Sequence, residues 1–136
     1  GICVGMQWLF EGSDEAPDVQ GLGALSGRVT RLQGDAAARL KIPHVGWNAL
    51  TPPAGERFQG RLLASLEPGA YVYFTHSYAA PVTDACVAAT THAESFAAVV
   101  ERDENLIGSL DDVVVGHHVA VFGDHETGAL CLDGTR

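Results

Sequence analysis

The sequence has little charge, few basic residues and no long apolar run. Only 18% of its 136 residues are charged, and 8 Lys and Arg stand against 17 Asp and Glu, for a formal net charge of -9. The basic residues are scattered, which argues against nucleic acids and anionic membrane surfaces, since both need clustered Lys and Arg. No apolar stretch approaches the roughly 18 residues that span a bilayer, and no signal segment opens the chain. We expect neither nucleic acid nor membrane as a partner.

Cysteine is also scarce, and no pattern of metal ligands is present. The three cysteines are Cys3, Cys86 and Cys131. They are far apart and odd in number, so we expect no disulfide framework and place the protein in a reducing cytoplasm. No C-x-x-C or H-x-x-x-H pair occurs, and His117, His118 and His125 are spaced for no more than adventitious metal binding. The sequence therefore predicts no metal site and no cofactor.

Hydrophobic residues make up 46% of the chain, enough to build the buried core of one domain. Apolar periodicity and turn residues predict the following segments. They are a helix over Met6–Phe10, a loop over Glu11–Val19, a strand over Gly27–Leu32, extended chain over Lys41–Leu50, a helical turn over Arg61–Leu66, strands over Ala70–Thr75, Cys86–Thr91 and Phe96–Val100, and weak strands over Asp112–Val115 and Val119–Phe122.

The most informative segment is the first, Gly1 to Gln7, in which Cys3 lies between two glycines where an apolar start meets a helical pattern. This composition is typical of a nucleophile elbow, a sharp strand-to-helix turn that only small neighbours permit. The turn would expose the sulfur at a helix N-terminus, which favours thiolate, and would point the N–H of Val4 at a developing oxyanion. A buried cysteine in an ordinary turn between glycines would have the same sequence.

Four sequence blocks, taken together, point to one protein family. They are Gly1–Glu11, Gly21–Val29, Lys41–Asn48 and Tyr73–Tyr78. In that order they resemble the glutaminase subunit of imidazole glycerol phosphate synthase, a member of the class I (triad) glutamine amidotransferases. The block Pro43–Asn48 is the specific one, because related amidotransferases share the elbow without it. The resemblance runs from Gly1 to about Gly108 and implies a partial amidotransferase domain over residues 1–108.

The resemblance implies an α/β, flavodoxin-like fold with a mostly parallel sheet, flanking helices and a β meander. It also carries departures. The family places a long N-terminal portion with a glycine-rich oxyanion loop before its elbow, whereas this chain begins at the elbow. The family closes its triad with His-Pro-Glu, which does not follow Asn105–Gly108 here. We therefore treat residues 109–136 as a divergent tail.

Site residues follow from the resemblance. Cys3 is the expected nucleophile and Val4 the oxyanion donor. The expected glutamine pocket comprises Gly5, Gln7, Glu11, His76, Ser77 and Tyr78, of which the last three act through their backbone. Taken alone, Gln7 lies either on a solvent face or in a pocket that recognises an amide. The adjacent pair His125 and Glu126 is the nearest approach to the missing base and its orienting carboxylate, although adjacent residues in extended chain point to opposite faces.

The resemblance implies that the block around Trp47 and Asn48 lies at the contact with a TIM-barrel cyclase subunit. By itself, an exposed Trp is an interface anchor about as often as a core residue. His44 is expected to be a structural histidine, and Cys86 and Cys131 ordinary small apolar residues.

The expected function is hydrolysis of L-glutamine and transfer of the ammonia to the cyclase in histidine biosynthesis. With an incomplete triad, the chain as given should have little glutaminase activity, because loss of a triad base costs several orders of magnitude in rate. Two alternatives remain: a non-catalytic module that docks on the cyclase, and another class I amidotransferase, such as one serving anthranilate or carbamoyl phosphate synthesis.

Overall fold

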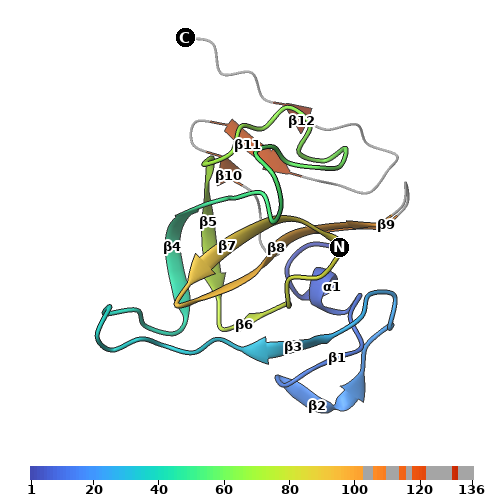
Figure 1. Cartoon of the computed structure of the whole chain (residues 1–136). Coiled ribbons are helices and arrows are strands. Elements are labelled where there is room, and N and C mark those ends of the chain that lie inside the picture. Colours follow the sequence, from blue (N-terminus) through green and yellow to red (C-terminus); the bar gives the residue numbers. More distant parts are fainter. Residues whose placement is uncertain (103–105, 110–113, 116–117, 122–129, 132–136) are drawn as a thin grey trace.

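The protein is described here by a computed structural model, which covers residues 1–102 in full and the backbone of 106–109, 114–115, 118–121 and 130–131 (Figure 1). Within these residues, one short helix precedes twelve strands. The bounds are α1 Val4–Gln7, β1 Gly12–Ser13, β2 Ala16–Gln20, β3 Arg28–Arg31, β4 His44–Ala49, β5 Tyr71–His76, β6 Tyr78–Ala79, β7 Cys86–His92, β8 Glu94–Arg102, β9 Leu106–Ser109, β10 Val114–Val115, β11 His118–Val121 and β12 Leu130–Cys131.

The strands form four hydrogen-bonded groups, β2-β1-β3-β6, β4-β5, β7-β8-β9 and β10-β11-β12. Isolated bridges join Thr51 to Ala89 and Ala80 to Ala97, so the chain after β4 meets β7 and the chain after β6 meets β8. In Figure 1, α1 lies between the β1-β2-β3 strands and the β7-β8 pair. The elbow helix therefore lies between strands that come early in the chain and strands that come much later.

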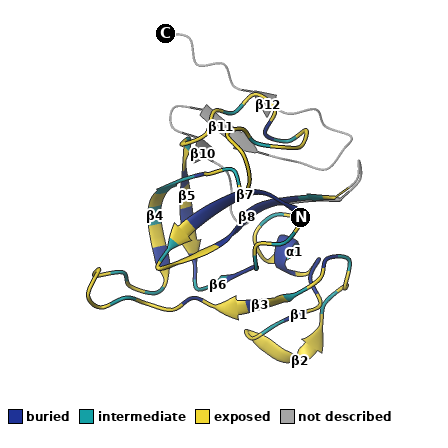
Figure 2. Ribbon diagram, viewed as in Figure 1, coloured by how far each residue is buried: buried dark blue, intermediate teal, exposed yellow. Residues whose placement is uncertain are grey.

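The core lies around one face of β5 and the buried central parts of β7 and β8 (Figure 2). Along β5, buried and exposed residues alternate strictly, because successive side chains of a strand point to opposite faces. Strands β7 and β8 instead contain runs of five consecutive buried residues, rich in alanine and valine. Such continuous burial requires cover on both faces, and the small side chains let the neighbouring elements approach closely.

Several predicted elements are confirmed. The strands expected over Gly27–Leu32 and Ala70–Thr75 are β3 and β5, the extended segment contains β4, and Cys86–Thr91 and Phe96–Val100 form the first two strands of the predicted meander. The chain at 61–65 makes turns, as expected. Strands β10 and β11 occupy parts of the two segments that were predicted as weak strands.

The predicted helix over Met6–Phe10 is shorter and begins earlier. Helix α1 ends at Gln7, and the chain then continues with bonds three residues apart, from Leu9 N to Met6 O (3.0 Å) and from Phe10 N to Gln7 O (3.2 Å). The apolar run therefore packs as one helical turn and a tighter turn, because Phe10 must be buried directly before the chain reverses into β1.

The loop predicted over Glu11–Val19 is wrong in part, because β1 and β2 form there. All five residues of β2 are exposed, so the segment carries no apolar alternation that a sequence reading would detect. Backbone pairing to β1 makes it a strand.

The α/β class and the meander are confirmed, but the expectation of a mostly parallel sheet with flanking helices needs correction. Within the described residues α1 is the only helix, and β1 with β3 is the only parallel pair. The other pairings between described strands are antiparallel, and a tight reversal connects β7 directly to β8.

Candidate functional site

Cys3 has the backbone conformation of a nucleophile elbow. It lies directly before α1 with φ 53° and ψ -121°, a combination that costs energy for any residue with a Cβ atom. Its carbonyl accepts the first helical hydrogen bonds, from Met6 N (2.9 Å) and Gln7 N (3.2 Å). The side chain is exposed. The turn therefore presents the sulfur outward, as the sequence predicted.

The two flanking glycines have different reasons to be glycine. A Cβ atom on Gly1 would lie 2.4 Å from the carbonyl oxygen of Gly5, so only glycine fits there. A Cβ atom on Gly5 would meet nothing within 4 Å. The requirement for small neighbours thus holds for Gly1, whereas Gly5 borders open space at the start of α1. The N–H of Val4 also lies in this first turn, where no carbonyl four residues earlier can accept it.

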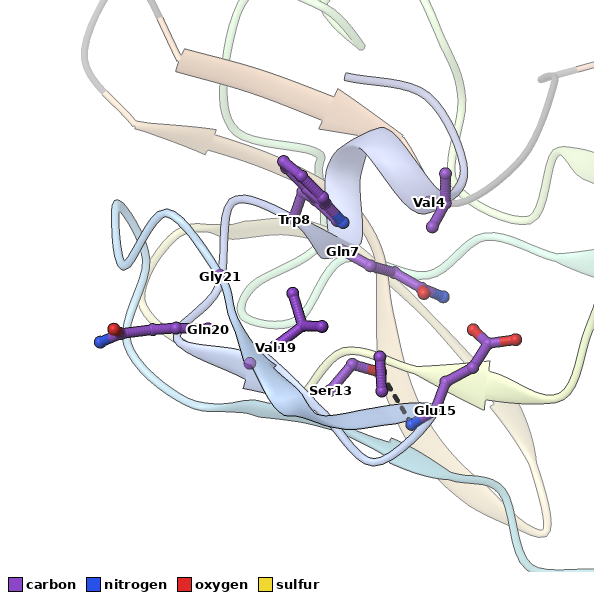
Figure 3. Close-up of a pocket in the computed structure, with 10 residues that line it drawn as sticks. Val4, Gln7, Trp8, Ser13, Glu15, Val19, Gln20 and Gly21 are labelled. Carbon is purple, nitrogen blue, oxygen red and sulfur yellow. Dashed lines mark hydrogen bonds between the residues drawn. The ribbon is translucent and has the colours of Figure 1, made fainter.

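A pocket of about 180 Å³ opens beside the elbow, between α1 and the β1-β2 strands. Its lining includes Val4, Gln7 and Trp8 from the elbow side, and Ser13, Glu15 and Val19 from the strands. Figure 3 shows the Gln7 amide and the Glu15 carboxylate on the same side of this pocket as Val4. The walls are mostly apolar, and the polar side chains that line the pocket include the Glu15 carboxylate and the carboxamides of Gln7 and Gln20.

Gln7 is buried, and its Nε2 donates a hydrogen bond to the Tyr78 carbonyl (3.2 Å). It therefore does not lie on a solvent face. Glu11 is placed differently from the expectation: its Oε2 accepts from Gly27 N (3.0 Å), which secures the preceding loop. The carboxylate at the pocket belongs to Glu15 instead.

The resemblance implied Glu11, the first acidic residue after Gln7, and Glu15 was not among the expected pocket residues. The chain leaves the helix before that point and reverses between β1 and β2, with Glu15 in the connection. The polar cluster Ser13-Asp14-Glu15 was the available signal for this reversal.

The segment from His76 to Tyr78 connects the elbow to the core. His76 is buried and bonds through Nε2 to His44 (3.0 Å) and through Nδ1 to the Tyr78 carbonyl (2.9 Å). The carbonyl of Ser77 accepts from Leu32 N (2.9 Å). The His76 ring thus lies among buried rings, and the Tyr78 backbone is the part of this segment that meets Gln7.

The candidate base and its orienter, His125 and Glu126, lie outside the described residues, as do most residues of the expected tail. The Cys86 thiol is buried, and burial raises its pKa to about 11. A thiol with so high a pKa is a poor nucleophile near neutral pH. Between the two cysteines whose side chains are described, Cys3 is therefore the reactive candidate.

Exposed apolar side chains gather on one face of the β4-β5 pair. Trp47 and Tyr73 are direct cross-strand neighbours, with ring centroids 5.7 Å apart in an edge-to-face arrangement. Val45 and Tyr71 lie on the same face, and all four are among the exposed large hydrophobic residues (Figure 2). Asn48 points to the opposite face, where its Nδ2 donates to the Thr91 carbonyl (2.9 Å).

The chain is similar to named proteins of one family. Proteins named imidazole glycerol phosphate synthase subunit HisH match it from Xylella fastidiosa (49% identical over 102 residues, 75% of this chain and 48% of the relative), Deinococcus radiodurans (41% over 136 residues, 97% and 54%) and Thermococcus kodakarensis (43% over 101 residues, 74% and 47%). Over the aligned residues, the chain belongs to the HisH family.

The chain spans about half the length of the curated relatives it matches. No protein-family profile matches it. In the described part of this HisH family member, no helix is both long and apolar enough to cross a membrane.

The elbow predicts opposite effects of the same substitution at its two glycines. Gly1→Ala should lower the free energy of unfolding by about 1–3 kcal/mol, because its Cβ overlaps backbone atoms of Gly5. Gly5→Ala should leave stability unchanged or raise it by about 0.5–1 kcal/mol, since alanine favours helix and has room. Urea unfolding of both variants measures the free energy of unfolding. Equal losses of stability in the two variants would contradict the elbow geometry.

A second prediction concerns acid. Burial, and then the neighbouring His92 and His76, lowers the pKa of His44 from its usual 6.5 to about 4. Between these values the unfolded chain binds a proton at His44 that the folded chain does not. Stability should therefore fall as the pH drops from about 6.5 to 4, by at most ~1.4 kcal/mol per pH unit from this group. Urea midpoints of wild type and His44→Asn between pH 7.5 and 4.5 test this. Parallel curves would show that His44 titrates normally.

Proposed function

We propose that this HisH family member is the glutaminase subunit of an imidazole glycerol phosphate synthase, which hydrolyses glutamine and delivers ammonia for histidine biosynthesis. The observation that carries the proposal is Cys3, an exposed thiol on a left-handed backbone conformation at the start of a helix beside a pocket. This arrangement is what a class I glutamine amidotransferase requires of its nucleophile. Family membership supports the same activity.

The pocket suits the free amino-acid end of glutamine. Glu15 supplies a carboxylate for the α-ammonium group, and Gln7 adds an amide beside it. An opposite charge and a hydrogen-bonding amide together favour a substrate with a free ammonium group over an uncharged amide. Val4, which directly follows Cys3 in the chain, lines the pocket on the same side as Gln7 and Glu15, so the side-chain amide of the substrate would lie toward Val4.

The chemistry proceeds in two halves. The Cys3 thiolate attacks the side-chain amide carbon, and the N–H of Val4 stabilises the oxyanion, a contribution of roughly 3–4 kcal/mol per donor in comparable sites. Collapse breaks the C–N bond, with a histidine giving the departing nitrogen its proton, and leaves a γ-glutamyl thioester. The same histidine then removes a proton from water, which attacks the thioester and releases glutamate. His125 with Glu126 remains our candidate for this base and its orienter.

The partner is a cyclase subunit that receives the ammonia. It docks on the exposed face of β4-β5 of this chain. This face, formed by Val45, Trp47, Tyr71 and Tyr73, presents three aromatic rings of the type enriched at interface centres. Asn48 supports the face from behind by joining β4 to the carbonyl of Thr91.

We place the protein in the cytoplasm. The proposed nucleophile is the exposed Cys3. A nucleophilic thiol needs a reducing compartment to stay active.

The second candidate function is a non-catalytic docking module, and the β4-β5 face favours it independently of the elbow. The two candidates differ in whether Cys3 reacts with a glutamine mimic. The specific block at Pro43–Asn48 argues against an amidotransferase of another pathway.

A glutamine-mimicking alkylating reagent should label Cys3. Mass spectrometry after limited exposure should find the adduct on Cys3 and none on Cys86, whose thiol is buried with a raised pKa. Glu15→Gln should raise the reagent concentration needed for half-maximal labelling about tenfold, because an ammonium loses its counter-charge. Glu11→Gln is the matched control and should change it less. Labelling at Cys86 with Cys3 untouched would overturn the assignment.

Trp47→Ala should weaken binding to the cyclase subunit by about 30-fold or more, since truncation of a central aromatic anchor commonly costs over 2 kcal/mol. Val82→Ala, which removes an exposed apolar side chain outside β4-β5, is the control and should leave affinity unchanged. Titration calorimetry against the cyclase measures both, after circular dichroism has shown equal folding. Equal affinities would remove Trp47 from the interface.

A further inference from the structure

Three histidines meet behind the β4-β5 pair, on the face opposite Trp47. His44 and His76 are buried, and the His92 ring stacks on His44 with centroids 4.1 Å apart. Phe74 and Phe96 pack against the His44 ring, with centroids 4.9 and 5.9 Å away. So many imidazoles in apolar surroundings need defined partners for their ring nitrogens.

One end of the hydrogen-bond chain is set by Asn48. Its Oδ1 accepts from Ala49 N (2.9 Å) and its Nδ2 donates to the Thr91 carbonyl (2.9 Å), so the orientation of the amide is determined. The same Nδ2 lies 3.4 Å from Nε2 of His44 and can only donate to it. His44 therefore accepts at Nε2 and carries its proton on Nδ1.

The other end is set by Tyr78. Its carbonyl can only accept, and Nδ1 of His76 lies 2.9 Å away, so His76 carries its proton on Nδ1. Nε2 of His76 must then accept from Nδ1 of His44, which lies 3.0 Å away. The two ends were assigned independently and require the same direction of donation, from Asn48 through His44 and His76 to the Tyr78 carbonyl.

The hydrogen-bond chain ends beside the pocket. The Tyr78 carbonyl accepts from His76 and also from Nε2 of Gln7 (3.2 Å). This second bond determines which end of the Gln7 amide is held by the protein. The acceptor end, Oε1, is the one not used on Tyr78, and Gln7 lines the pocket beside Glu15. An acceptor next to a carboxylate suits an ammonium group.

We propose that His44 and His76 are positioning residues. As neutral Nδ1–H tautomers they hold the Tyr78 carbonyl, which orients the Gln7 amide to accept from the ammonium group of the substrate. This inference rests on the proposed function for the identity of the ligand, but the hydrogen-bond chain itself does not.

The first experiment needs no ligand. Two-bond ¹⁵N–¹H spectra of the chain at pH 7.5 should show His44 and His76 as neutral Nδ1–H tautomers. An Nε2–H tautomer at either residue would overturn the proposal. The Gln7 side-chain NH₂ should exchange slowly with water in wild type and become solvent-like in His76→Leu, which removes the donor to Tyr78.

Two variants make this comparison specific. His76→Asn keeps an N–H donor near the position of Nδ1 and should preserve the slow exchange of the Gln7 NH₂. His92→Leu removes a ring that stacks on His44 but takes no part in the hydrogen-bond chain. This variant should therefore also preserve the slow exchange of the Gln7 NH₂. If the Gln7 NH₂ also exchanged rapidly in His92→Leu, the core around the histidines would be loosened in general, and the specific role of His76 would be overturned. The wild-type tautomers decide the matter if His76→Leu does not fold.

The second experiment separates binding from reactivity. With the glutamine-mimicking reagent, His76→Leu should raise the half-saturating concentration about tenfold and leave the maximal labelling rate of Cys3 within about twofold, with His76→Asn restoring wild-type binding. A lower maximal rate at unchanged saturation would contradict positioning. If wild type is not labelled at Cys3, the proposed function fails, and the Gln7 and tautomer signals alone decide the hydrogen-bond chain.

Discussion

The Tyr78 carbonyl is the contact on which the elbow depends. It accepts from Gln7 in α1 and from His76 in β5, and so joins a helix of one turn to the buried core. A helix of four residues has almost no stability of its own, because helix formation has a costly nucleus. The strained conformation at Cys3 persists only if its surroundings hold it. Burial of Met6, Phe10 and Gln7 against the strands provides that hold.

The β4-β5 pair does two jobs because its side chains alternate. One face contributes His44, Phe74 and His76 to the core, and the other exposes Trp47, Tyr71 and Tyr73. A register shift of one residue would exchange these faces and bury the wrong set. The side chain of Asn48 is on the inner face, where it both joins β4 to β7 and sets the direction of the histidine hydrogen bonds. The surface proposed for the partner and the histidine chain are thus parts of one small element.

Much of the candidate site was readable from local sequence. The elbow at Cys3, the strand before His76 and the exposed Trp47 each depend on a few consecutive residues, and motif and alternation report such features directly. Glu15 was missed because its place depends on a reversal between two strands that have no apolar pattern. The mostly parallel sheet was expected from the resemblance alone. Buried runs such as β7 reveal burial but do not say which neighbour pairs with them, or in which direction, so the sequence offered no check on it.

The sequence by itself determined the chemistry available to this HisH family member, namely one cysteine between glycines, a glutamine one helical turn later and an aromatic block that alternates along a strand. These are properties of residue type and spacing, and they survive without knowledge of the fold. Only the tertiary structure decided which carboxylate reaches the pocket, that the Gln7 amide bonds to Tyr78 and that three histidines pack together. Those contacts join residues up to 71 positions apart, and such distances are closed by the packing of the core rather than by local preference.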